Sequence, residues 1–307
     1  MNTLLKLFPI LFYSLLVIFL AIYLQTLDWS TLSTAELSWG YALIATVFAL
    51  AMRFWGAYVW FVLLKSLGAA NLSSQKAQLV YVYAKTWLGR YIPGTAPWIL
   101  GKIYFASKHG ISKNKLAVSS LLEGALQIVV TLVLAFAILL FDRRLDVIDD
   151  GFKVLMAVIL VGCIVAIVPA VFNRLIALAY KIIRRKTFPA EHMAGNATIL
   201  RGTGLYVIGA IFSGLSFFFI AKAVYAPLGY DQLLFVFGAS NLASAVGMLA
   251  LFAPSGIGVR EGIQVLLLSL IMPVEFALLI AVVTRLWSII ADAIFYFSTV
   301  LLRRVFA

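Results

Sequence analysis

Charged side chains inside long apolar segments are the residues of this sequence most able to do chemistry. Glu123, Arg285, Asp292 and Arg53 each lie within such a segment. A charge at the centre of a bilayer costs at least about 2.5–3.5 kcal/mol on insertion scales, so such residues normally face a protein interior or a wet pocket. We expect Glu123 and Arg285 to serve function, because they occupy corresponding places in the two halves of the chain, and Asp292 to be a structural partner of an arginine. Arg53 could snorkel, pair with an acid or serve function.

Two proline-glycine breaks interrupt the apolar chain at corresponding places in its two halves. The first occupies residues 91–98 and the second residues 252–258. Each is followed by a glycine and a basic residue, and then by a long apolar segment with one of the charges above, Glu123 or Arg285. The interval from break to charge is nearly the same in both halves. Matched interruptions of this kind point to the binding site of a transporter.

These breaks and charges together predict one site. Unwound backbone survives in a membrane only inside protein or against a wet cavity, and the helix that starts after each break offers free amides to an anion. The residues expected to form the breaks are Pro93, Gly94, Trp98, Gly101, Pro254, Gly256 and Gly258. The residues expected to bind substrate are Lys102, Glu123, Arg260, Glu261 and Arg285. The cations would hold an anionic headgroup, and the glutamates would pair with them or bind an ammonium group.

The composition is that of a polytopic membrane protein. Of 307 residues, 64% are hydrophobic and only 12% are charged, and the mean hydropathy is +1.06. A soluble domain has about 25% charged residues. We expect an all-α fold of about eight transmembrane helices in one integral membrane domain, residues 1–307.

Several other classes of function are excluded by the same composition. The net charge of +12 is concentrated in a few loops, which fits membrane orientation rather than nucleic-acid binding. The single cysteine, Cys163, lies in an apolar run and cannot form an intrachain disulfide or a cysteine metal site. His109 and His192 have no paired ligand nearby, so no metal or other cofactor is expected.

The pattern along the chain gives the elements that must position the site. The candidate spans are residues 7–25, 40–64, 115–141, 152–173, 202–224, 232–253, 258–272 and 276–302. The stretch 72–107 mixes basic and aromatic residues in its first part, 75–91, which suits an interfacial or partly inserted helix, and then meets Pro93. We expect the stretch to form a re-entrant hairpin. Basic residues dominate the regions 65–115 and 174–201 and the C-terminal end. Both termini are therefore expected on the cytoplasmic side.

That orientation predicts an inverted-topology repeat. The first broken hairpin enters from the cytoplasm and the second from the outside, so residues 72–141 would form one repeat unit and residues 232–302 the other. Transporters with this design bind substrate between their repeats. The alternative is that Pro and Gly are simply common in membrane helices.

Two segments resemble the signatures of a known family. Residues 88–98 with Gly101-Lys102, 110–112 and 121–123 are similar to the first signature of the lysylphosphatidylglycerol synthase transmembrane-domain family, and residues 254–262 with 284–286 to its second. The resemblance covers nearly the whole chain. It implies the flippase half of the multiple peptide resistance factor, which moves aminoacylated phosphatidylglycerol between leaflets. Stand-alone members accompany polysaccharide, glycolipid or hopanoid pathways.

The chain departs from that family at informative positions. Many members have an arginine where Lys102 stands, and some have one where this chain has Gly124. These differences leave the lipid headgroup open. The soluble aminoacyl-transferase domain is not in this sequence, so we do not expect the chain to make lysyl-lipid.

Three classes of function remain. The first is a non-enzymatic lipid translocase of a bacterial inner membrane, which moves or binds an anionic phospholipid, glycolipid or polyprenyl-linked lipid. The second is a membrane enzyme acting on a lipid, although the only adjacent acid pair, Asp149-Asp150, falls in a predicted outer loop without a second cluster. The third is a non-transporting partner of glycosyltransferases or other lipid-pathway enzymes. No oligomeric state follows from the sequence.

Overall fold

The protein folds as a bundle of helices. The computed structural model describes residues 36–69, 72–91, 96–147, 149–184, 193–250, 253 and 256–306. The long helices are α3 (Trp39–Ser66), α6 (Lys113–Leu139), α7 (Asp150–Ile167), α9 (Asn196–Val224), α10 (Leu233–Leu249) and α12 (Val274–Phe306). The shorter ones are α4 (Lys76–Trp87), α5 (Ala96–Ser107), α8 (Pro169–Arg184) and α11 (Val259–Leu268), with 3₁₀ turns at Ser73–Gln75, Leu88–Tyr91, Arg143–Val147 and Tyr230–Gln232.

Six helices within the described part of the chain are long and apolar enough to cross a membrane. They are α3, α6, α7, α9, α12 and α10 with the turn before it. The chain is therefore a multi-pass membrane protein. The predicted span 7–25 lies outside the described residues. The predicted span 258–272 is replaced by α11, whose ten residues rise about 15 Å, half the thickness of the hydrocarbon core.

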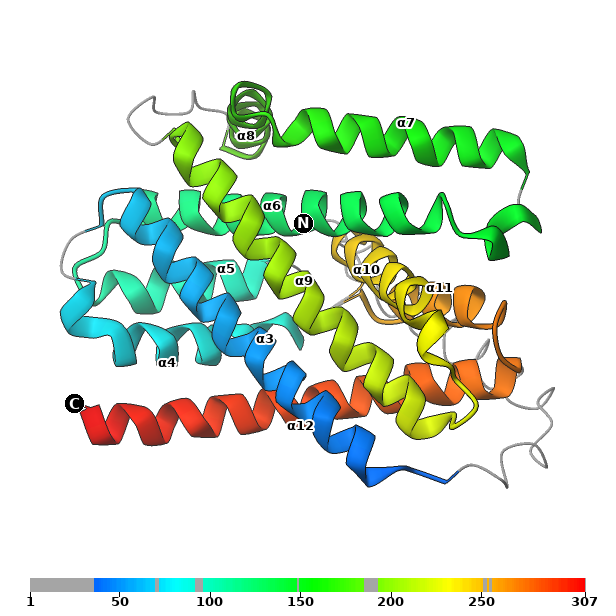
Figure 1. Ribbon diagram of the computed structural model, residues 1–307. Coiled ribbons are helices and arrows are strands. Elements are labelled where there is room, and N and C mark those ends of the chain that lie inside the picture. Colours follow the sequence, from blue (N-terminus) through cyan, green and yellow to red (C-terminus); the bar gives the residue numbers. More distant parts are fainter. Residues whose placement is uncertain are drawn as a thin grey trace, which may run out of the picture.

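Two helical hairpins lie toward opposite ends of the bundle, as Figure 1 shows. One consists of α4 and α5, and the other of α10 and α11. The first is tightly packed because Gly101 on α5 faces Thr86 on α4, where a Cβ on the glycine would lie 3.0 Å from the threonine Cγ2. The break residues Pro93 and Gly94 lie outside the described residues.

The second hairpin depends on two glycines with positive φ. Gly256 has φ +69° and Gly258 has φ +85°, a region that other residues enter only with strain. A Cβ on Gly256 would lie 2.8 Å from the Cα of Gly247 in α10. The chain can therefore turn close beneath α10 before α11 begins. The break residue Pro254 lies outside the described residues.

Helices α7 and α8 form an arm at one side of the bundle. The predicted span 152–173 extends too far, because α7 ends at Ile167 and a new helix begins at Pro169. Proline disfavours helical geometry in the residue before it and fits the first position of a helix. In Figure 1, α8 is seen nearly end-on while α6 and α7 run across the view. Part of the predicted basic loop 174–201 is thus helical.

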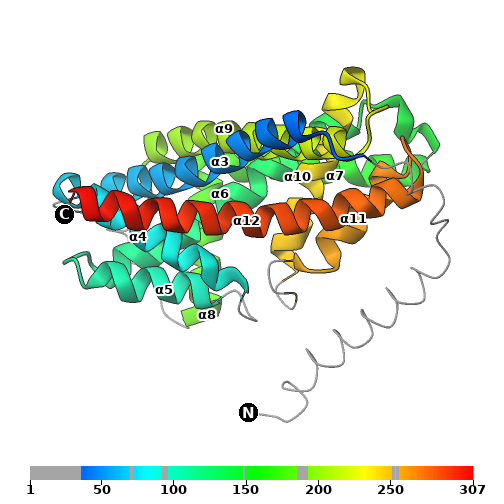
Figure 2. The ribbon, with the colours of Figure 1, turned by 90° about the horizontal axis from the view of Figure 1, so that it is seen from below.

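Helix α12 contacts elements from both halves of the chain. Figure 2 shows α3 and α9 on one side of it and the α4–α5 hairpin on the other. Helices α3 and α9 approach closely because α3 turns the small residues Ala42, Ala45 and Ala49 inward. Two hydrogen bonds join these helices, from Trp55 Nε1 to the Leu205 carbonyl at 2.7 Å and from Ser216 Oγ to the Ala45 carbonyl at 3.0 Å.

Candidate functional site

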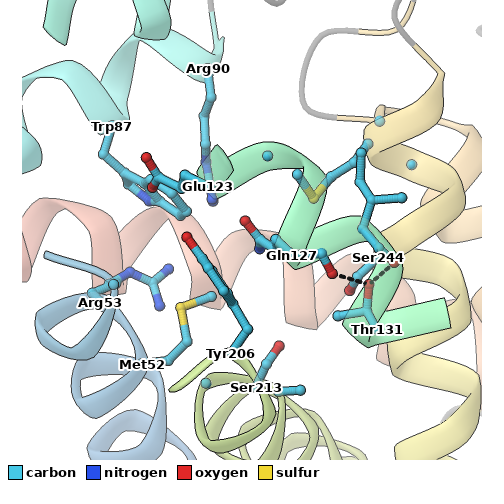
Figure 3. A pocket seen from close by; sticks show the side chains of 18 of the residues that line it. Met52, Arg53, Trp87, Arg90, Glu123, Gln127, Thr131, Tyr206, Ser213 and Ser244 are labelled. Atoms are coloured by element: carbon cyan, nitrogen blue, oxygen red, sulfur yellow. Dashed lines mark hydrogen bonds between the residues drawn. The ribbon is translucent and has the colours of Figure 1, made fainter. Parts of the chain in front are cut away.

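A cavity of about 490 Å³ inside the bundle is lined by residues of both hairpins. Trp87, Arg90 and Trp98 line it from the first hairpin, and Gly256 and Arg260 from the second. Helices α3, α6, α8, α9 and α12 also contribute to the wall. Figure 3 shows polar side chains from several of these elements pointing into the same space. The two interruptions found in the sequence are therefore brought together around one hollow.

Glu123 of α6 lies on the cavity wall and is bound to Lys102 of α5. The Lys102 ammonium pairs with Glu123 Oε2, and the Tyr83 hydroxyl donates to Oε1 at 3.1 Å. Lys102 is 0% exposed and Glu123 is 2% exposed. The ammonium also lies 4.3 Å from the ring centre of Tyr83, 4.5 Å from that of Trp98 and 5.2 Å from that of Trp60. Lys102 thus occupies an aromatic cage closed by a carboxylate.

Glu261 and Arg285 form the corresponding pair in the second half. Arg285 Nη1 on α12 lies 3.6 Å from Glu261 Oε1 on α11. The other carboxylate oxygen, Glu261 Oε2, accepts the amide of Gly258 at 2.7 Å and so caps the start of α11. In each half an ion pair joins the short helix after the break to the long helix that follows. The signs are reversed, because the cation is on the short helix in the first half and on the long helix in the second.

Arg260 is the predicted site residue that faces the cavity as a cation. It is partly buried and lines the cavity, and its guanidinium makes no hydrogen bond or ion pair with any residue that the structure describes. It lies in the first turn of α11, where the helix dipole adds positive potential.

Asp292 binds two arginines and is the structural partner that the sequence predicts. Its Oδ1 accepts from Arg53 Nε at 2.5 Å and from Trp87 Nε1 at 3.1 Å. Its Oδ2 accepts from the Tyr91 hydroxyl at 2.5 Å and lies 2.9 Å from Arg90 Nη2. Of the possibilities for Arg53, pairing with an acid is the one confirmed. This network ties α3, the tip of the first hairpin and α12 together.

Three buried polar atoms on the cavity wall have no hydrogen-bond partner among the described residues. They are Arg90 Nε, the Tyr206 hydroxyl and Thr284 Oγ1. A buried polar group without a partner costs about 1–3 kcal/mol. Neither Arg90 nor Tyr206 is among the residues expected at the site. The position of Arg90, three residues before Pro93, could have pointed to the site. Nothing in the sequence around Tyr206 distinguishes it from other residues of an apolar helix.

The site carries an excess of positive charge. Five basic side chains, Arg53, Arg90, Lys102, Arg260 and Arg285, are set against three acidic ones, Glu123, Glu261 and Asp292. The net charge of these eight described side chains is therefore +2, because Asp292 is shared by two arginines and Arg260 has no acid bound to it. Among the described residues, no group of three His, Cys, Asp or Glu side chains could hold a metal ion.

The predicted site residues fall into two groups. Glu123, Arg260, Trp98 and Gly256 line the cavity itself. Lys102, Glu261 and Arg285 lie beside it in their ion pairs, while Gly101 and Gly258 shape the hairpins. Helix α10 adds Asn241 and Ser244 to the cavity wall.

Comparison with known proteins agrees with the resemblance seen in the signatures. The family model for the lysylphosphatidylglycerol synthase TM region matches residues 7–295. Searches of curated proteins and of solved structures found no match. The matched region contains both hairpins, both ion pairs and the cavity. The chain therefore belongs to the family of the lysylphosphatidylglycerol synthase transmembrane region.

Proposed function

We propose that this protein is a lipid translocase that receives an anionic lipid headgroup in the central cavity. The observation that carries the proposal is the excess of positive charge at the hairpin tips, with Arg260 facing the cavity and no acid bound to it among the described residues. A buried cation is costly unless an anion neutralises it. A phosphate- or carboxylate-bearing headgroup would do so, with its hydrocarbon chains remaining in the bilayer.

The two halves would move the headgroup by alternating exposure. We propose that residues 72–141 and 232–302 are inverted repeats whose hairpins reach the cavity from opposite sides of the membrane. The ion pairs Lys102–Glu123 and Glu261–Arg285 would link each hairpin to its long helix during this motion. The lipid is moved without covalent change, and enzymes of a lipid or glycosyl-transfer pathway would supply or use it.

The distribution of charge supports an orientation with both termini in the cytoplasm of a bacterial inner membrane. Arg303 and Arg304 end α12 at the same end of the bundle as α8 (Figure 1). Acidic residues gather at the opposite end, in the turn between α6 and α7. Cytoplasmic ends of membrane helices are typically enriched in Lys and Arg.

The proposal is tested by lipid movement in proteoliposomes. The probe is fluorescent phosphatidylglycerol, and phosphatidylcholine with the same chains reports the effect of headgroup charge. Arg260→Met should lower phosphatidylglycerol movement by at least about tenfold, since a charge-assisted hydrogen bond contributes about 1.5–3 kcal/mol. Arg304→Met, at an exposed arginine near the end of α12, is the matched control and should leave movement unchanged.

Arg260→Lys should restore part of the movement because it restores the charge without the guanidinium geometry. The proposal is wrong if purified protein moves neither lipid, or if Arg260→Met and Arg304→Met move phosphatidylglycerol equally well.

A further inference from the structure

Helix α8 presents three different faces. Phe172 and Ile176 are buried against α3, α6 and α9. Leu175, Leu178 and Ile182 follow one another at helical spacing and are 48–69% exposed. Arg174 and Lys181, two turns apart, are exposed on the remaining side. An amphipathic helix with basic residues on its polar face is typical of one that lies in a membrane surface.

The inner face of α8 also forms part of the cavity wall. Ile176 and Ala179 line the same hollow as Arg260, and so do Leu121 and Gly124 of α6. A Cβ on Gly124 would meet nothing within 4 Å, so α6 leaves open space there. The cavity therefore extends from the hairpin tips outward to the underside of α8.

The outer faces of α8 are exposed, as the exposed fractions of Leu175, Leu178 and Ile182 show. Asn173 Nδ2 of α8 donates a hydrogen bond to the carbonyl of Ala194, just before α9, at 2.9 Å. The exposed leucines are placed for contact with hydrocarbon chains, and Arg174 and Lys181 for contact with anionic headgroups in the same leaflet. A continuous path thus leads from the basic side chains of α8, along its exposed apolar face, to the open space beside Gly124.

We propose that α8 is the portal through which an anionic phospholipid of the adjacent leaflet reaches the cavity. The headgroup meets Arg174 and Lys181, passes Ala179 and Gly124, and reaches Arg260, while the hydrocarbon chains stay beside the exposed leucines of α8. The arrival of the headgroup at Arg260 rests on the proposed function, whereas the contact between the outer surface of α8 and anionic lipid is independent of it.

Site-specific photo-cross-linking tests the portal. The photoreactive residue p-benzoylphenylalanine replaces Ala179 or, as the control, Ala157, a half-buried residue of α7 that is not on the cavity wall. The full chain is reconstituted with phosphatidylglycerol or phosphatidylcholine carrying a clickable acyl chain. We expect position 179 to cross-link phosphatidylglycerol much more strongly than phosphatidylcholine, and position 157 to show no preference between the two lipids.

Charge removal identifies the cause. Each basic residue near a membrane surface raises anionic lipid binding by about fivefold. The double variant Arg174→Gln, Lys181→Gln should therefore lower the cross-linking of phosphatidylglycerol from position 179 by at least about fivefold. Cross-linking of phosphatidylcholine from the same position should not change. The control pair Lys113→Gln with Arg304→Gln removes the same charge from exposed positions on α6 and α12 instead of α8, and it should change cross-linking of neither lipid.

A third photoreactive position, Gln127 of α6 on the cavity wall, separates this inference from the proposed function. Cross-linking from 127 but not from 179 would overturn the portal and leave the function standing. Cross-linking from 179 but not from 127 would support the portal and overturn the cavity as destination. No cross-linking from either position would overturn both.

Discussion

Removing the charge of Lys102 should lower the free energy of unfolding more than removing the charge of Glu123. Lys102→Met leaves a carboxylate that is 2% exposed with only the Tyr83 hydroxyl as a partner among the described residues. Breaking a buried ion pair from one side costs about 3–5 kcal/mol. Glu123→Gln leaves an ammonium that still faces the rings of Trp60, Tyr83 and Trp98. Those rings contribute about 2 kcal/mol to a desolvated cation, so this variant should lose about 1–3 kcal/mol.

The double variant should recover much of the loss. With both charges gone, the introduced methionine would pack in the aromatic cage and the introduced glutamine would keep the tyrosine hydrogen bond. Such replacements of a buried pair are often nearly neutral. The free energy of unfolding is measured for both single variants and the double variant in the same mixed micelles. Asp146→Asn, which breaks the pair between Lys153 and a 67% exposed aspartate, is the control and should cost less than about 1 kcal/mol.

Lipid movement in the same set of variants separates stability from function. If the pair serves transport, the double variant regains stability without regaining movement. The reasoning about the cage is refuted if Glu123→Gln costs as much as Lys102→Met. The reasoning about the buried pair is refuted if the costs of the single variants simply add in the double variant.

Two further predictions use matched positions. Asp292→Asn should destabilise the protein by about 3–5 kcal/mol because two buried arginines lose their acid, whereas the exposed Asp146→Asn again serves as a control in thermal unfolding. Gly256→Ala should cost well over the roughly 1–2 kcal/mol of a left-handed alanine, because its Cβ would also meet Gly247 at 2.8 Å. Gly110→Ala has φ +78° but open space around the Cβ, so it should show the backbone cost alone; equal losses at both glycines would contradict the role of the close approach.

The sequence predicts the two hairpins well because proline and glycine act locally. Apolar runs likewise predict most ends of the long helices to within about four residues, although α9 begins at Asn196, six residues before the predicted span 202–224. The end of α7 is hidden in the sequence because the apolar run continues through Val168 and Pro169, where the chain turns into α8. The predicted span 258–272 is wrong for a different reason. The sequence after the second break is largely apolar, but the helix that forms there, α11, has only ten residues.

The site itself is only partly predictable, because partners in it are far apart in the chain. A lone charge in an apolar run is visible in the sequence, but its partner is chosen by packing, as with Arg53 and Asp292. Arg90 is one basic residue among several in the sequence, and only the hairpin places it beside Asp292. Tyr206 lies in an unremarkable apolar helix, and only the cavity shows that its hydroxyl has no partner among the described residues.

The opposite polarity of the two ion pairs determines which helices a charged molecule in the cavity would attract. A negative guest attracts α5 through Lys102 in one half and the long α12 through Arg285 in the other. A positive guest attracts α6 through Glu123 and the short α11 through Glu261. An anion would therefore pull on α5 of the first hairpin and a cation on α11 of the second. A zwitterion would pull on both hairpins at once.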